Sequence, residues 1–140
     1  MKTKVIAFDI YGTLFPTEDP DAEVFPVRTG ALSFLERCKN LNLTPCTSSD
    51  SSLANLLIDL NGAKIKKYFG FFFQMEPLEP KDFPRILYHY KLRPSELFVI
   101  GDSPSLDIEP AIASGCNTLQ VPRYVNIRTG NTDISKIIIL

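Results

Sequence analysis

The stretch KVIAFDIYGTLF, residues 4–15, places an acid, Asp9, at the end of a short run of β-branched and aromatic residues. The run has no helical spacing, so it predicts a strand buried on both faces, with Asp9 at its carboxyl end. A buried carboxylate is costly unless it has a partner or a task. The stretch therefore indicates both a strand of a central sheet and a candidate site.

Runs of this kind alternate with apolar residues at helical spacing along the rest of the chain. Helices are predicted near residues 31–38, 53–60, 83–90 and 106–114, and further strands near 41–46, 68–74, 97–102 and 118–122. This alternation predicts an α/β protein with a three-layer, Rossmann-like fold, in which helices cover both faces of a mainly parallel sheet of five or six strands. A chain of 140 residues fits one domain, residues 1–140. The segment 134–140 is compatible with an edge strand, a terminal helix or a segment that faces a partner.

The composition is ordinary for a globular domain, with 44% hydrophobic residues, 22% charged residues and a formal net charge of -1. This charge gives no electrostatic reason to expect binding to nucleic acid or to an anionic membrane. The apolar run before Asp9 is too short for a signal sequence or a membrane span. The three cysteines are widely spaced, as in proteins of reducing compartments, so we expect a cytoplasmic protein.

Polar residues gather where the predicted strands end, which is the edge of a parallel sheet at which ligands bind. The residues expected there are Asp9, Tyr11, Thr13, Thr47, Ser48, Lys81, Asp102 and Asp107. Asp9 and Asp102 would repel each other unless a cation lay between them, so the pair suggests a hard, oxygen-seeking metal ion, Mg²⁺. A metal, a lysine, a hydroxyl and a carboxylate nucleophile together suit phosphoryl transfer.

Four ordered motifs, FDIYGTL, CTSSD, a loop lysine and VIGDSPSLD, resemble those of the haloacid dehalogenase (HAD) superfamily of hydrolases, from about residue 4 to residue 122. The resemblance implies that Asp9 is the nucleophile and forms an aspartyl-phosphate or aspartyl-ester. It implies that Lys81 neutralises the nucleophile and the intermediate. It also implies a metal site of Asp9, Asp102, Asp107 and the backbone carbonyl of Tyr11.

The same resemblance implies a hydroxyl that binds the transferring group. Thr47 matches that residue, and Ser48 is the alternative because Pro45 blurs the alignment. Thr13 shapes the loop after the nucleophile, so the candidate substrate-binding residues are Thr13, Thr47 and Ser48. Several of the candidate residues also have a simpler, purely structural interpretation. Thr47, Ser48 and Asp50 match helix N-caps, and Asp107 matches a cap of the helix that it opens. Lys81 matches a solvated loop lysine.

Tyr11 departs from the pattern of the phosphatases in the family, which usually carry a second Asp there. That Asp protonates the leaving alkoxide and then activates water. Tyrosine has a reference pKa of about 10, so it is a poor acid and base near neutral pH. Losing a positioned acid or base typically slows a reaction about a hundred- to ten-thousand-fold.

The form Asp-x-Tyr-Gly-Thr is similar to that of the 2-haloacid dehalogenases, whose halide leaves without a proton. Two departures weaken that alternative. Those enzymes need no metal and carry Ser at the position of Asp102, and they use a helical cap. Only 37 residues lie between Asp9 and Thr47, too few for such a cap.

We therefore expect a HAD-like hydrolase without a large cap domain that acts as a Mg²⁺-dependent phosphatase. Tyr11 stands at the catalytic position of the usual acid and base, so turnover is expected to be slow or restricted to good leaving groups. The alternatives are a 2-haloacid dehalogenase-like hydrolase and a non-catalytic relative that binds phosphate or a protein partner. An open site suits a phosphorylated small molecule or a macromolecular substrate, unless a second subunit of a homo-oligomer covers it. Residues 16–29 are expected to form a small local flap. Arg28, Lys91 and Arg123 are candidates for substrate contact, but each matches an ordinary surface charge, and His89 matches a surface position.

Overall fold

The computed structural model describes residues 2–18 and 26–139. The strands are β1 (Val5–Phe8), β2 (Thr44–Ser49), β3 (Phe71–Gln74), β4 (Leu97–Gly101) and β5 (Asn117–Gln120). The α-helices are α1 (Ala31–Asn40), α2 (Leu53–Gly62), α3 (Phe83–Tyr90) and α4 (Glu109–Ala113). Short 3₁₀ turns lie at Lys66–Tyr68 and Pro94–Glu96, and a π-helical turn at Pro104–Ile108 leads into α4.

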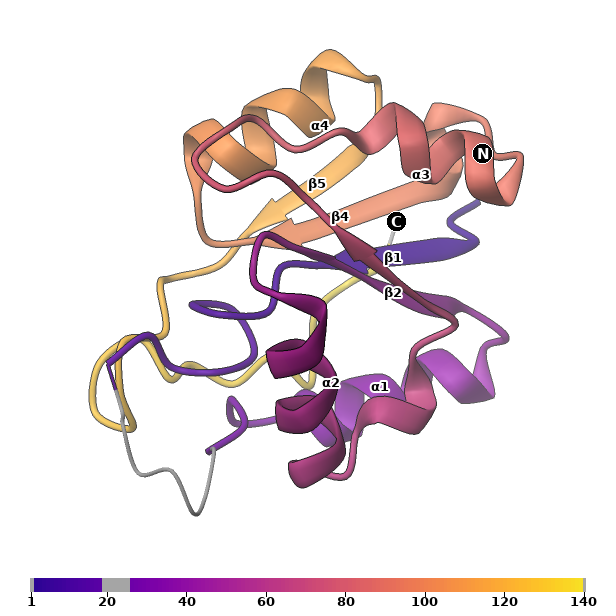
Figure 1. Cartoon of the computed structure of the whole chain (residues 1–140). Helices are drawn as coiled ribbons and strands as arrows, with labels where there is room; N and C mark the ends of the chain where they lie inside the picture. The colour runs from indigo at the N-terminus through magenta and orange to yellow at the C-terminus, as the bar shows by residue number, and fades with distance from the viewer. Residues whose placement is uncertain (1, 19–25, 140) are drawn as a thin grey trace.

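The five strands form one sheet in the order β3-β2-β1-β4-β5, and every neighbouring pair is parallel (Figure 1). In the centre of the sheet, Phe8 of β1 is paired with Thr47 of β2 on one side and with Ile100 of β4 on the other. The carboxyl ends of these three strands therefore lie next to one another. The predicted α/β fold with a parallel sheet is confirmed.

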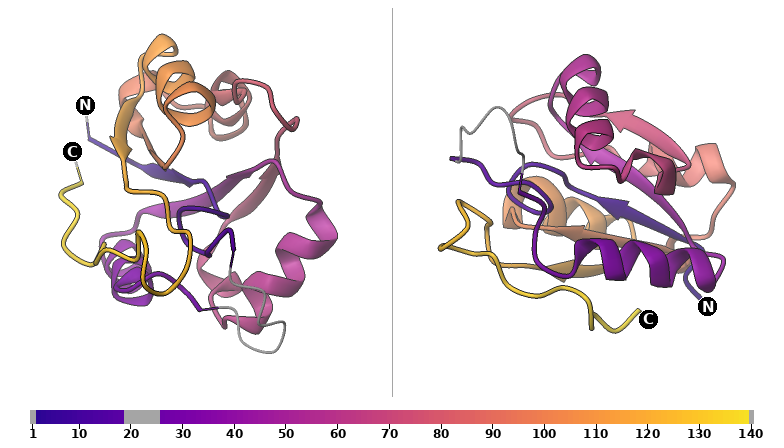
Figure 2. Two further views of the ribbon diagram at one scale, coloured as in Figure 1. Left: turned by 90° about the vertical axis from the view of Figure 1, so that its left-hand side faces the viewer. Right: turned by 90° about the horizontal axis from the view of Figure 1, so that it is seen from below.

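Helices cover both faces of the sheet, with α1 and α2 on one side and α3 and α4 on the other (Figures 1 and 2). β1 supplies both cores, because side chains alternate along a strand. Ile6 and Phe8 pack with α1 and α2, whereas Val5 and Ala7 pack with α3 and α4. All four side chains are buried, so the prediction of a strand buried on both faces is also confirmed.

The third strand and the end of the chain differ from the sequence predictions. β3 begins at Phe71, because residues 66–68 form a 3₁₀ turn. Residues 134–139 form neither a strand nor a helix. Instead, Ile134, Ile137 and Ile139 pack against the core beside α1, and the end of the chain runs along that helix (Figure 2). This segment thus covers the chain's own core.

The described part of the connection from β1 to α1 contains no helix and no further sheet, so no large cap domain is present among the described residues. Most of the predicted flap, residues 19–25 of 16–29, lies outside those residues. The flanking residues are bound to the body of the domain, since the amide of Thr17 donates to the carbonyl of Tyr124 and the hydroxyl of Tyr124 donates to the carbonyl of Pro26. No helix in the described ranges is long and apolar enough to cross a membrane.

Candidate active site

A cavity of about 250 Å³ opens at the carboxyl ends of the central strands. Asp9 follows β1 directly, and its amide continues the sheet by donating to the carbonyl of Ile100 (3.0 Å). Asp102 follows the neighbouring strand β4. The cavity is lined by Asp9, Tyr11, Thr17, Asp50, Lys81, Asp102, Ser103, Leu106, Asp107 and Arg123. It therefore brings together five of the eight residues expected at the site.

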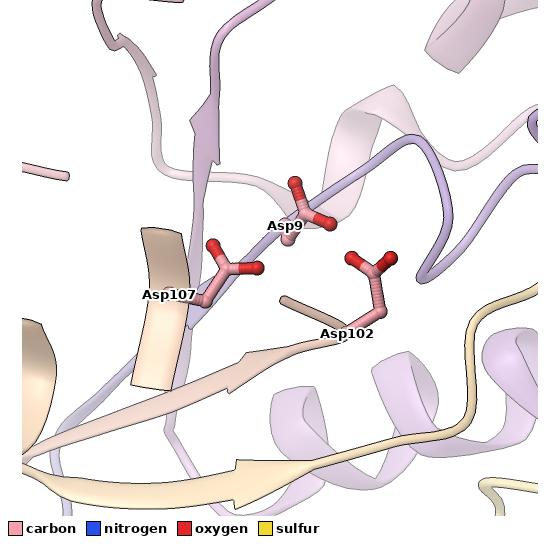
Figure 3. A group of neighbouring side chains, drawn as sticks. All are labelled: Asp9, Asp102 and Asp107. Carbon is pink, nitrogen blue, oxygen red and sulfur yellow. The ribbon is translucent and has the colours of Figure 1, made fainter. Parts of the chain in front are cut away.

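Three carboxylates face one another in this cavity (Figure 3). Asp9, Asp102 and Asp107 each offer an oxygen atom within 4.8 Å of the others. Asp107 comes from the π-helical turn, and its Oδ2 accepts a hydrogen bond from the amide of Ser103 (3.1 Å). Ser103, and not Asp107, caps that turn, so the simpler interpretation of Asp107 as a helix cap is wrong.

Lys81 joins two of these acids. Its Nζ lies 2.8 Å from Oδ1 of Asp9 and 2.6 Å from Oδ1 of Asp107, and the residue is only 6% exposed. Burial opposes the charge of Lys81, but the two carboxylates outweigh it and raise its pKa above the ordinary value. Lys81 is therefore a buried ammonium in contact with the nucleophile candidate, and not a solvated loop lysine.

Asp102 lacks such a partner. Its only described ion pair is with Nε of Arg123, at 3.7 Å, and the side chain of Arg123 is 67% exposed. Burial, followed by the neighbouring Asp9, raises the pKa of Asp102 to about 8. Burial and Asp9 also raise the pKa of Asp107 to about 6, although Lys81 opposes this. The cluster thus has more carboxylate charge than its cations compensate, and its all-oxygen donors fit a hard divalent ion.

The loop after β1 is built closely around these acids. The hydroxyl of Thr13, fully buried, donates to Oδ2 of Asp9 (2.9 Å) and lies 3.4 Å from Oδ1 of Asp102. Gly12 has a φ of +92°, and a Cβ there would lie 2.7 Å from Oδ2 of Asp102. Only glycine allows both this backbone conformation and this close approach. Thr13 therefore orients the nucleophile candidate from beneath the cavity.

The two candidate hydroxyls of β2 differ in orientation. Thr47 donates to the carbonyl of Phe73 (3.2 Å), so its hydroxyl is used within the sheet. Ser48 lies on the sheet face of Cys46, the face to which Val5 and Ala7 also belong. One step beyond the Phe8–Thr47 pair, the parallel register sets Ser48 beside Asp9.

The Ser48 hydroxyl is buried and has no hydrogen-bond partner among the described residues. A buried, unsatisfied hydroxyl is costly, so it indicates a missing partner. The geometry favours Ser48 over Thr47 as a donor to a group bound at Asp9. Neither residue lines the cavity, and neither is a helix cap, because both belong to β2 and Ser52 caps α2.

Tyr11 lines the cavity, but its hydroxyl is bound elsewhere. It donates a hydrogen bond to the Asp59 carboxylate on α2. Burial, followed by this hydrogen bond, raises the pKa of Tyr11 well above its ordinary value. The phenol therefore remains protonated across the neutral range and is a poor exchangeable acid or base.

The position of Arg28 differs most from what the sequence predicted. The prediction of a surface charge is wrong, because Arg28 is among the largest fully buried side chains. Its Nη1 donates to the carbonyls of Thr13 (3.2 Å) and Pro122 (2.9 Å), and its Nε donates to the carbonyl of Thr132 (2.9 Å). Arg28 thereby ties the loop after β1 to the C-terminal segment. No local pattern signals this role, because its partners lie far along the chain.

The other three candidate basic residues lie in different places. Arg123 lines the cavity, although its position in the sequence matched an ordinary surface charge. His89 is exposed and packs against the ring of Phe71, as expected for a surface residue. Lys91 is exposed at the end of α3 and does not line the cavity.

The comparisons with known proteins agree with this architecture. Residues 78–136 match a family model described as HAD-hydrolase-like. No curated protein sequence matches the chain. Together with the similar fold of a HAD-superfamily hydrolase, the match to the family model confirms the resemblance to the HAD superfamily.

Solved structures of the superfamily align over most of the chain. A HAD-superfamily hydrolase from Ehrlichia chaffeensis aligns with a TM-score of 0.70 at 20% identity, over 86% of this chain and 89% of that one. A predicted phosphoglycolate phosphatase from Haemophilus somnus 129pt aligns with a TM-score of 0.74 at 15% identity, over 91% and 89%. CbbY from Rhodobacter sphaeroides, solved in complex with phosphate, aligns with a TM-score of 0.72 at 14% identity, over 91% and 89%. These likenesses establish the fold.

Proposed function

We propose that the protein is a Mg²⁺-dependent phosphatase that works through an aspartyl-phosphate on Asp9. The observation that carries this proposal is the setting of Asp9, a buried carboxylate between the ammonium of Lys81 and the acids Asp102 and Asp107. A nucleophile of this kind needs compensating positive charge before it can approach an anionic phosphate. The phosphatase named among the similar folds is consistent with this chemistry.

Each residue of the candidate site has a separate role in this proposal. Lys81 and Thr13 each contact one oxygen of the Asp9 carboxylate, which fixes its rotation before attack. Ser48 is set to donate to a phosphoryl oxygen, because its hydroxyl is buried beside Asp9 and has no partner among the described residues. Asp9, Asp102 and Asp107 would hold Mg²⁺, which supplies positive charge to the transferring phosphoryl group. The Tyr11 carbonyl completes this ligand set in our proposal.

The nature of the substrate follows from the open cavity. No large cap covers it among the described residues, so phosphorylated small molecules and phosphate groups on macromolecules both have access. Tyr11 in place of an acidic residue favours slow turnover. The dehalogenase alternative is weakened by Asp102, because a buried acid that faces Asp9 would repel the carboxylate of a haloacid unless a cation lay between them.

The test is hydrolysis of 4-nitrophenyl phosphate by the wild-type protein, with Mg²⁺ or with a chelator, beside Asp9→Asn. We expect turnover that requires Mg²⁺ and falls to background in the variant. Glu109→Gln, which removes an exposed carboxylate outside the cavity, serves as the matched control and should retain activity. Turnover without a metal, together with halide release from a 2-haloacid, would replace this proposal with the dehalogenase.

A further inference from the structure

Hydrolysis of an alkyl phosphate needs a proton for the leaving alkoxide, and the residue two places after Asp9 cannot readily supply it. The hydroxyl of Tyr11 donates to Asp59. The following inference rests on the proposed phosphatase function and concerns the source of that proton. We propose that Asp50, on the loop between β2 and α2, is the general acid and base of the reaction.

Four carboxylates line the cavity among the described residues, and Asp50 is the one outside the acidic cluster. The other three face one another and contact Lys81, Thr13, Ser103 or Arg123. Asp50 is half-buried and makes no hydrogen bond or ion pair with any other described residue. Its carboxyl group is therefore available to a molecule bound in the cavity.

The sheet order sets Asp50 on the opposite side of Asp9 from the metal-site acids. β1, which carries Asp9, lies between β4 and β2. Asp102 and Asp107 follow β4, whereas Asp50 follows β2. A phosphoryl group at Asp9 would thus have the metal site on one flank and Asp50 on the other.

The loop that carries Asp50 is held in place without using the Asp50 side chain. The hydroxyls of Ser49 and Ser51 share a hydrogen bond of 2.7 Å, and the amide of Ser51 donates to Oγ of Ser49 (3.2 Å). Ser52 caps α2 by accepting a hydrogen bond from the amide of Asn55. The interpretation of Asp50 as a helix cap is therefore wrong, and no contact with another described residue accounts for its carboxylate.

The two steps balance as follows. As Asp9 attacks phosphorus and the bond from phosphorus to the ester oxygen breaks, protonated Asp50 gives its proton to that oxygen and an alcohol leaves. Asp50, now a carboxylate, takes a proton from a water molecule, whose oxygen attacks phosphorus and breaks the bond to Asp9. Inorganic phosphate leaves, and both aspartates return to their starting states.

The test compares two substrates in the wild-type protein, Asp50→Asn and Asp50→Ser, all with Mg²⁺. 4-Nitrophenolate leaves without a proton, whereas the alkoxide of glycerol phosphate needs one. For glycerol phosphate, kcat/KM should fall about a hundred- to ten-thousand-fold in both variants. For 4-nitrophenyl phosphate, kcat/KM should change by less than about threefold, because it reports only steps up to loss of the leaving group. Its kcat should fall, since breakdown of the aspartyl-phosphate needs the base.

The matched control is Asp59→Asn, which replaces the charged partner of the Tyr11 hydroxyl with a neutral amide but leaves Asp50 in place. It should keep the ratio of the two kcat/KM values near that of the wild type. Equal losses on both substrates in the Asp50 variants, or no loss on either, would overturn the assignment. So would a collapse of the ratio in Asp59→Asn alone, which would assign the proton to the Tyr11–Asp59 pair. An inert wild type would instead overturn the phosphatase itself.

Discussion

The ammonium of Lys81 lies 2.8 Å from Oδ1 of Asp9, and both residues are 6% exposed. Water therefore contributes little to the solvation of either charge, and each depends on the other. Lys81 makes a second contact with Asp107 at 2.6 Å, so one cation serves two buried acids. This arrangement leaves Asp102 without an equally close cation, which is why the site fits a metal ion as well as a lysine.

Replacing Lys81 with Met should remove phosphatase activity and destabilise the fold in a pH-dependent way. Breaking a buried ion pair costs about 3 to 5 kcal/mol, because an uncompensated charge remains. Burial raises the pKa of Asp107 to about 6, so this acid can avoid the cost at low pH by binding a proton. The loss of unfolding free energy should therefore be larger at about pH 8 than at about pH 5. Urea unfolding at the two pH values measures it. An equal loss at both would contradict the pairing described here.

Mg²⁺ should raise the melting temperature, and more strongly at higher pH. The pKa values of Asp102 and Asp107 are raised to about 8 and about 6. A raised carboxyl pKa contributes stability that is complete below its unfolded value of about 3.9 and is lost as pH rises through the folded values. The metal-free protein therefore loses stability between about pH 4 and pH 8, and Mg²⁺ restores it by neutralising the ionised acids.

The expected gain from Mg²⁺ is about 2.7 kcal/mol at a hundredfold excess over its dissociation constant. Thermal melts with Mg²⁺ or chelator at about pH 6 and pH 8 measure this. Asp102→Asn is the control, because an amide at this position neither titrates nor carries charge for the ion. If Mg²⁺ stabilised this variant as much as the wild type, the ion would bind elsewhere.

Substitutions of Tyr11 distinguish its contribution to stability from a contribution to proton transfer. Tyr11→Phe removes the hydrogen bond to Asp59 and should cost about 1 kcal/mol of unfolding free energy. Its kcat/KM values for aryl and alkyl phosphates should change by less than about threefold. A large and selective loss on the alkyl phosphate would mean that the phenol itself supplies the proton.

Tyr11→Asp should restore activity on alkyl phosphates to a protein in which Asp50, the proposed general acid, has been replaced. In the Asp50→Asn background, it introduces a carboxyl group two residues after Asp9. We expect kcat/KM for glycerol phosphate to recover by at least about tenfold, because a positioned acid contributes a hundredfold or more. The comparison of Asp50→Asn with the double variant under the same Mg²⁺ concentration measures this. A double variant no better than Asp50→Asn would show that the position cannot deliver a proton to the leaving group.

Arg28 should prove essential for stability. Arg28→Leu leaves the carbonyls of Thr13, Pro122 and Thr132 without their buried donor. Each hydrogen bond from the charged guanidinium contributes about 1.5 to 3 kcal/mol, so the total loss should reach about 3 kcal/mol or more. Arg28→Lys should recover only part of it, because an ammonium cannot reproduce the planar fork of donors. Urea unfolding measures both variants, and losses below about 1 kcal/mol would contradict the role assigned to Arg28.

Some features of the site could be predicted because they depend on neighbours in the chain. The run of β-branched and aromatic residues in β1 predicted that Asp9 follows a buried strand, and the structure confirms this. The choice between Thr47 and Ser48 was not predictable. It depends on which sheet face each side chain occupies, and that follows from the register with β1.

The sequence by itself determined the succession of strands and helices along the chain and the acids that follow β1 and β4. It could do so because hydrophobic periodicity and capping act over a few residues. Only the tertiary structure decided that Lys81 joins Asp9 to Asp107, that Arg28 is buried, and that Asp50 lines the cavity. These contacts join segments far apart in the chain. Their geometry depends on the order of the strands in the sheet and on the need to pair each buried charge. The local spacing of residues in the sequence determines neither of these.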